Sequence, residues 1–107
     1  MLNIQEIMDT LILYHKDPVK YQGYDEVFYP ELSAWLCEDE SRAKDFLQKC
    51  TDDDLAIAAW AFEDLADTFG LPFVEWLTEF CSSKPPNEHI KEELNYARKE
   101  NSLEPIQ

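Results

Sequence analysis

Side chains that could catalyse a reaction or bind a metal are few in this 107-residue chain, and they are widely spaced. Of the two histidines, His15 and His89, only His89 has a carboxylate one helical turn further on, at Glu93. One such pair supplies too few ligands, and a di-iron helix bundle requires Glu-x-x-His motifs that neither histidine completes. We therefore expect structural or solvated histidines, and we predict neither a metal nor a cofactor.

Motifs for nucleophilic catalysis and phosphate binding are missing as well. The cysteines Cys37, Cys50 and Cys81 form no CxxC pair, and nothing in the sequence pairs them with an activating base. Two isolated glycines cannot build a phosphate-binding loop. The acidic run Asp52–Asp54 lacks the glycine and the final glutamate of an EF-hand loop, and helix capping explains it. We expect that the protein is not an enzyme and that its thiols are free in a reducing cytosol.

Charge is the strongest signal in the composition. The chain has 23 Asp and Glu against 9 Lys and Arg, which gives a formal net charge of −14 at pH 7. Nucleic acid and anionic membranes are disfavoured as direct partners because phosphates recruit Lys and Arg. Basic proteins or metal cations are the natural partners, although acidity can also serve solubility alone. No segment approaches the ~20 apolar residues of a membrane span, and the acidic start is unlike a secretory signal, so we expect a cytoplasmic protein.

Local signals predict helices along the whole chain. Hydrophobic residues make up 45% of it, enough for one core, and no stretch alternates as a half-buried strand would. The similar segments around Trp35 and Trp76 suggest stacked helix pairs. We predict an all-α, compact bundle of about six short helices in a single domain over residues 1–107. The expected elements are helices at 3–15, 30–37, 41–50, 51–69, 72–81 and 87–101, a connection at 16–29 and a frayed tail from about 102. Asn3 and Asn87 suit the N-caps of the first and last helices, and Pro30 suits the first turn of the second.

The predicted helix 51–69 has the clearest signals. Thr51 suits its N-cap, Asp54 completes a capping box, and Gly70 suits the residue after its last turn. At roughly 100° per residue, one wide face is apolar and is predicted to face the core. The residues on that face are Leu55, Ala58, Phe62, Leu65, Ala66 and Phe69.

The opposite side of this helix carries Trp60 among acidic side chains. A tryptophan surrounded by carboxylates is typical of an interface anchor, because tryptophan is enriched at binding hot spots and its ring can stack with arginine. Alternatively, Trp60 and Ile57 pack beneath another helix or beneath the connection 16–29. The acidic neighbours of Trp60 on that side are Asp53, Glu63, Asp64 and Asp67.

Two further segments supply candidate partner-binding residues. One is the acidic joint between the second and third predicted helices, and the other is the tyrosine-bearing connection 16–29. Connections of that length are often functional, tyrosine offers contact area at low entropic cost, and acidic surfaces speed association with basic proteins. The candidate residues in these segments are Glu38, Asp39, Glu40, Tyr21 and Tyr24.

Four segments, at 28–36, 50–55, 62–65 and 73–77, share their pattern with a known group of proteins. Over roughly Phe28 to Cys81, the chain resembles small immunity proteins of bacterial polymorphic toxin systems, above all those of contact-dependent growth inhibition. Such proteins are typically cytosolic and acidic, and each binds one cognate toxin. Many of these toxins are basic nucleases whose active sites the immunity protein plugs. The resemblance assigns no site residues to this chain.

The resemblance implies an immunity protein that binds and neutralises a basic toxin domain, such as a nuclease, by occluding its active site in a 1:1 complex. The alternative is an acidic DNA mimic of the anti-restriction or anti-CRISPR type, whose carboxylates would imitate a phosphate track. A mimic would compete with DNA for several unrelated proteins, whereas an immunity protein would bind one toxin. The aromatic content favours the immunity protein, because a charge mimic needs fewer large anchors.

Overall fold

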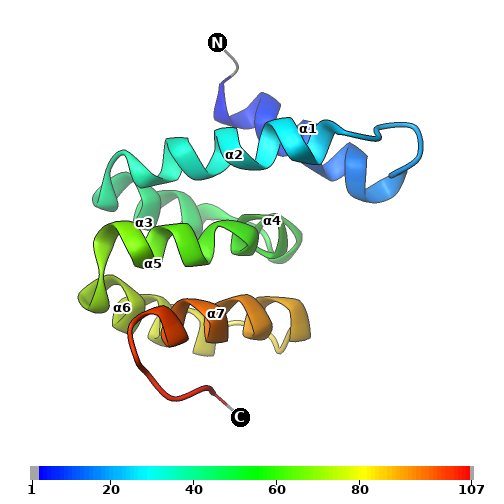
Figure 1. Cartoon of the computed structure of the whole chain (residues 1–107). Helices are drawn as coiled ribbons and strands as arrows, with labels where there is room; N and C mark the ends of the chain where they lie inside the picture. Colours follow the sequence, from blue (N-terminus) through cyan, green and yellow to red (C-terminus); the bar gives the residue numbers. More distant parts are fainter. Residues whose placement is uncertain (1–2, 107) are drawn as a thin grey trace.

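The computed structural model describes residues 3–106, and every regular element in that range is helical. Figure 1 shows three stacked layers of helices, with α1 and α2 in one, α3 to α5 in the middle and α6 and α7 in the third. The all-α prediction is confirmed, and six helical segments result if α4, η1 and α5 count as one unit. The elements are α1 (Ile4–Lys16), α2 (Tyr24–Cys37), α3 (Glu40–Lys49), α4 (Asp52–Ala58), the 3-10 turn η1 (Ala59–Ala61), α5 (Phe62–Phe69), α6 (Leu71–Ser82) and α7 (Glu88–Glu100).

One apolar core joins the three layers. The apolar face predicted for helix 51–69 lies in the centre of this core, and all of its residues are buried except Phe69, which is half-buried. Since this face packs against the other layers, it holds the opposite side of the same segment toward solvent. Side chains with no exposed surface reach the core from every layer: Leu11, Leu36, Leu47, Phe62, Phe73, Leu77 and Ala97.

The predicted N-caps are confirmed. The Asn3 side chain accepts a hydrogen bond from the Glu6 N–H at 2.9 Å. Thr51 Oγ1 accepts one from the Asp54 N–H at 3.1 Å. In the same way, Asn87 caps α7. These bonds satisfy backbone donors that the first helical turn leaves without partners, so they fix where each helix begins.

The second helix begins at Tyr24 and not at Pro30, so the predicted connection 16–29 is wrong in its second half. Gly23 adopts a left-handed conformation, with φ of +87°, and marks the turn into α2. Pro30 therefore lies inside the helix, where it has no N–H to donate to the carbonyl of the preceding turn. Phe28 and Tyr29 pack against the core, and this packing offsets the missing bond.

The predicted continuous helix 51–69 is interrupted by η1 at Ala59–Ala61, the turn that carries Trp60. A 3-10 turn has about 3.0 residues where an α-helix has about 3.6, so each residue rotates further around the axis. A uniform helical projection therefore misplaces the side chains beyond this turn relative to those before it. Asp53 and Asp64, predicted on one side, end up on different flanks of Trp60.

Residues 104–106, which the sequence predicts to be frayed, are hydrogen-bonded to α7. Asn95 brackets Ile106: its Nδ2 donates to the Ile106 carbonyl at 3.2 Å, and its Oδ1 accepts from the Ile106 N–H at 2.7 Å. Arg98 Nε donates to the carbonyl of Glu104 at 2.8 Å. Within residues 3–106, no helix is both long enough and apolar enough to cross a membrane.

Candidate functional site

Trp60 stands half-exposed on the surface, with 48% of its area accessible to solvent. Its ring packs against His89 of α7 at 4.6 Å and against Tyr29 of α2 at 5.8 Å, between ring centroids. Neighbouring Ala59 and Ala61 are buried, so the turn itself is fixed to the core. One part of the indole therefore packs against other helices and another part is exposed to solvent. This combines the exposed anchor and the buried packing that the sequence left as alternatives.

A groove lies on one flank of Trp60, between α2 and α5, and we call it the α2–α5 groove. It has a volume of about 510 Å³. Its acidic residues are Asp64 and Asp67, and among the described residues that line it there is no Lys, Arg or His. The full lining is Tyr29, Pro30, Ser33, Ala34, Cys37, Trp60, Asp64, Asp67 and Thr68.

A second groove lies on the other flank of Trp60, between α1 and α4, and we call it the α1–α4 groove. It has a volume of about 650 Å³. Here two carboxylates share the walls with one lysine and both histidines of the chain. The full lining is Ile12, His15, Lys16, Thr51, Asp53, Asp54, Ala56, Ile57, Trp60 and His89.

Asp64 in the α2–α5 groove is held in place by α2. Ser33 Oγ donates a hydrogen bond to Asp64 Oδ2 at 2.5 Å, across residues far apart in sequence. Both Asp64 and Asp67 are exposed, and they stand three residues apart on one face of α5. The groove thus combines an indole wall with two carboxylates, one of which is oriented by a hydrogen bond.

A hydrogen bond between His15 and Tyr29 joins α1 to α2 beside the α1–α4 groove. Burial raises the pKa of Tyr29 above its usual range, so its hydroxyl stays protonated and donates to neutral His15 Nε2. Burial lowers the pKa of His15 below 6.5; His89 contributes in the same direction and Asp25 opposes it. His15 is therefore neutral at pH 7, and the groove gains positive charge only on acidification.

Glu63 is turned away from both grooves, toward the acidic residues of α7. Glu93 is almost fully buried, and burial is the main cause of its raised pKa, followed by the charges of Glu63 and Glu92. Tyr96 donates its hydroxyl to Glu92 Oε1 at 3.0 Å, and this bond raises the pKa of Tyr96. Glu63 therefore belongs with a group of mutually repelling acids beside α7, and it lines neither side of Trp60.

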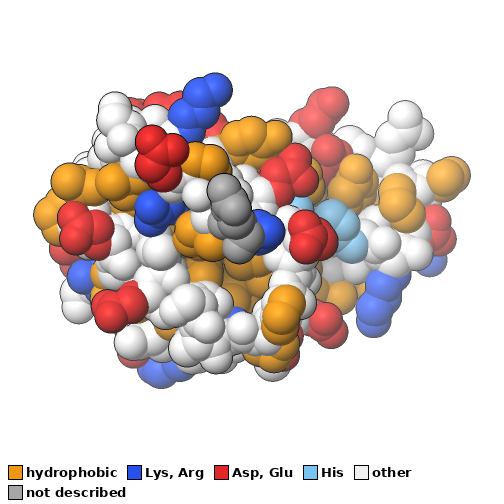
Figure 2. Space-filling model, turned by 90° about the horizontal axis from the view of Figure 1, so that it is seen from below, with side chains coloured by type: hydrophobic (Ala, Val, Ile, Leu, Met, Phe, Trp, Pro, Cys, Tyr) orange, Lys and Arg blue, Asp and Glu red, His pale blue; other side chains and the backbone are white. Residues whose placement is uncertain are grey.

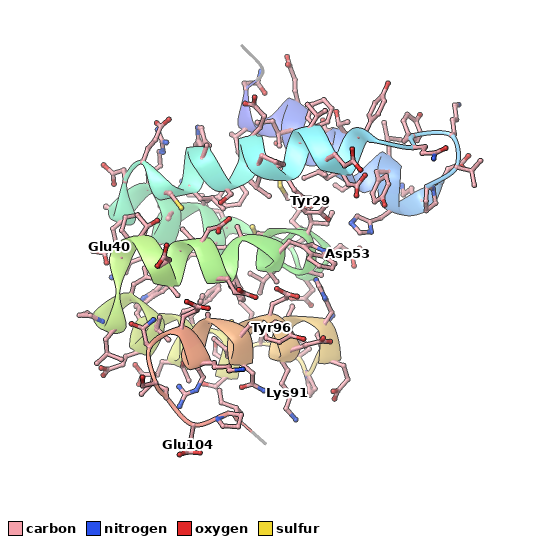
Figure 3. The ribbon with its side chains drawn as sticks, in the orientation of Figure 1. Tyr29, Glu40, Asp53, Lys91, Tyr96 and Glu104 are labelled. Carbon is pink, nitrogen blue, oxygen red and sulfur yellow. The ribbon has the colours of Figure 1, made fainter. Side chains whose placement is uncertain are left out.

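Two residues of the acidic joint 38–40 form an ion pair and a helix cap within the protein, and the joint lies away from Trp60. Glu38 pairs with Arg42 at 2.8 Å, and Asp39 is the N-cap of α3, accepting from the Arg42 N–H at 2.9 Å. In Figure 3, Glu40 lies at the opposite end of the bundle from Tyr29 and Asp53. The joint therefore belongs to a different part of the surface from the Trp60 region.

Tyr21 and Tyr24 lie at the turn between α1 and α2, the end that projects beyond the rest of the bundle in Figure 1. Their rings contact each other at 5.5 Å, and Tyr24 contacts Phe28 at 5.7 Å. Val19 and Val27 nearby are 85% and 57% exposed. These tyrosines thus form an aromatic tip that is separate from the two grooves.

Sequence reasoning overlooked the residues that complete the two grooves. Tyr29 and Ser33 stand four residues apart on α2, a spacing that would have placed them on one face had the helix been traced back past Pro30. Lys16 belongs to α1 and His89 to α7, both far from Trp60 in the sequence, and no local pattern links them to it. Only the packing of α1 and α7 around η1 brings them there.

The described residues also include the three cysteines, none of which forms a disulfide. No group of three or more His, Cys, Asp or Glu side chains in residues 3–106 could hold a metal ion. Burial raises the pKa values of Cys50 and Cys81 to about 12, so both thiols are protonated at neutral pH and are weak nucleophiles.

The chain matches no protein-family model, no curated protein and no solved structure. Its function must therefore be argued from the chemistry of its surface and not from a relative.

Proposed function

We propose that this protein is an immunity protein, which binds and neutralises one basic toxin domain of the nuclease class by covering its active site. The observation that carries the proposal is the half-exposed Trp60, fixed between two grooves whose walls bear carboxylates. A rigid aromatic anchor in an acidic surround suits a positively charged, concave partner.

On the face seen in Figure 2, the distribution of charge favours a discrete binding face over imitation of DNA. On the face shown in Figure 2, Asp and Glu side chains are spread out, with hydrophobic and uncharged side chains between them. A DNA mimic requires carboxylates in a regular track that replaces phosphates. The net charge of −14 then serves mainly to speed association with a basic partner.

The test is to identify the genes adjacent to the one that encodes this chain and to express a toxin-like domain encoded there, with and without the chain. We expect co-expression to restore growth, the purified proteins to form a 1:1 complex, and the association rate to fall ~10-fold or more between 50 and 500 mM salt. Failure to restore growth would refute the proposal. Competition with DNA for several unrelated DNA-binding proteins would instead identify a mimic.

A further inference from the structure

The three tryptophans of this protein differ in what covers their rings. The guanidinium of Arg42 lies 4.1 Å from the centre of the Trp35 ring, and Arg42 also pairs with Glu38 at 2.8 Å and donates to the Trp35 carbonyl. The Lys44 ammonium lies 5.3 Å from the centre of the Trp76 ring. In both cases a cation of the chain itself covers the indole.

The Trp60 ring contacts the rings of His89 and Tyr29, but among residues 3–106 no Lys or Arg lies over it. Glu38 follows Trp35 by three residues, and Asp64 follows Trp60 by four, so each indole has a carboxylate one turn further on. Trp60 is also 48% exposed, which leaves a face for a cation from outside.

The α2–α5 groove provides the remaining features of an arginine site. Its apolar wall, formed by Trp60, Tyr29 and Pro30, suits the aliphatic stem of a long side chain. Asp64, oriented by Ser33, and Asp67 suit the charged end. No cation among the described lining residues competes for these carboxylates.

Arginine fits this combination better than lysine. Its planar guanidinium stacks on an indole while its N–H groups reach carboxylates in the plane, whereas the lysine ammonium is a compact and strongly hydrated charge. The arrangement of Arg42 over Trp35 beside Glu38 shows this geometry within the same chain.

We infer that the α2–α5 groove receives one arginine side chain of the partner, stacked on Trp60 and paired with Asp64 and Asp67. This inference rests on the proposed function, since it names the chemistry by which the same surface recognises a basic domain. It assigns the α2–α5 groove, rather than the α1–α4 groove, as the site of specific recognition.

The test uses the full chain labelled with ¹⁵N and titrated with L-argininamide or L-lysinamide, with the Trp60 indole N–H signal assigned through Trp60→Phe. We expect argininamide to shift the signals of Trp60 and Ser33 while leaving the indole signals of Trp35 and Trp76 in place. Lysinamide should give an affinity at least about threefold weaker, because it cannot stack and pair at once.

The double variant Asp64→Asn with Asp67→Asn should weaken argininamide binding about three- to tenfold. Its matched control is Glu75→Gln with Glu79→Gln, which removes the same charge from exposed positions outside the groove and should retain binding. Equal loss in both variants, or equal affinity for the two amides, would overturn the arginine site. The two proposals can fail separately. If the chain does not neutralise a toxin, the argininamide result still tests the groove. If the toxin binds the Asp64/Asp67 variant as tightly as the wild-type, only the arginine site is refuted.

Discussion

The two grooves beside Trp60 share one indole but differ in the charges opposite it. The α2–α5 groove has Asp64 and Asp67 and no described Lys or Arg in its lining, whereas the α1–α4 groove has Lys16 beside its two carboxylates. Net charge alone therefore does not identify a binding face in a protein with 23 acidic residues. The positions of the few cations decide which acidic groove attracts a basic side chain.

The largest effect is expected at Trp60, which both grooves share. Trp60→Ala should weaken binding of the toxin domain by about 2 kcal/mol or more, about 30-fold, since buried tryptophans dominate interfaces. Its own stability should fall far less than the ~3–5 kcal/mol expected for the fully buried Phe62→Ala. Calorimetric titration and urea unfolding measure the two quantities. Equal destabilisation by the two variants would place Trp60 in the core and remove it as an anchor.

Substitutions of the carboxylates in the two grooves should have different effects, on binding in one groove and on stability in the other. Asp64→Asn with Asp67→Asn should lower the affinity for the toxin domain about three- to tenfold with little change in unfolding free energy. Asp53→Asn with Asp54→Asn should mainly cost stability, about 0.3–1 kcal/mol each, because these residues lie in the first turn of α4. If the Asp53/Asp54 variant lost affinity for the toxin domain and the Asp64/Asp67 variant did not, the α1–α4 groove would be the site of specific recognition.

Glu93→Gln should stabilise the protein by about half a kcal/mol at pH 7, since it removes a buried charge that faces Glu63 and Glu92. The folded-state pKa of Glu93 is raised, so the wild-type loses stability as pH rises above 4.5, and the variant should lose less. Thermal unfolding at pH 4.5 and pH 7 tests this. Glu93 lines neither groove, so a change in toxin affinity would extend the binding face toward α7.

The smallest effect concerns acidification of the α1–α4 groove. Because the folded-state pKa of His15 lies below 6.5, the unfolded chain takes up this proton first, and stability should fall as pH drops from 6.5 toward that folded-state value. The variant His15→Gln should lose less over the same window, and NMR titration of the His15 ring should give a pKa below 6.5. A value above 6.5 would show that Asp25 outweighs burial and His89.

Local signals were sufficient for most of the secondary structure and failed where packing opposed them. Capping residues such as Asn3, Thr51 and Asn87 correctly fixed helix starts, because a cap depends on neighbours within four residues. Pro30 misled the prediction, since the packing of Phe28 and Tyr29 extends α2 across a residue that normally begins a helix. The η1 turn left no sequence signal that separates it from an α-helix.

The sequence by itself determined an acidic, all-helical protein, the core face of the segment 51–69 and a tryptophan on the opposite side. These features follow from residue type and helical period, which act over a few residues. Only the tertiary structure decided which acids accompany Trp60, placing Asp64 and Asp67 on one flank, Asp53 on the other and Glu38 to Glu40 elsewhere. The reason is physical: a groove is formed by side chains from different layers, and their meeting depends on how whole helices pack.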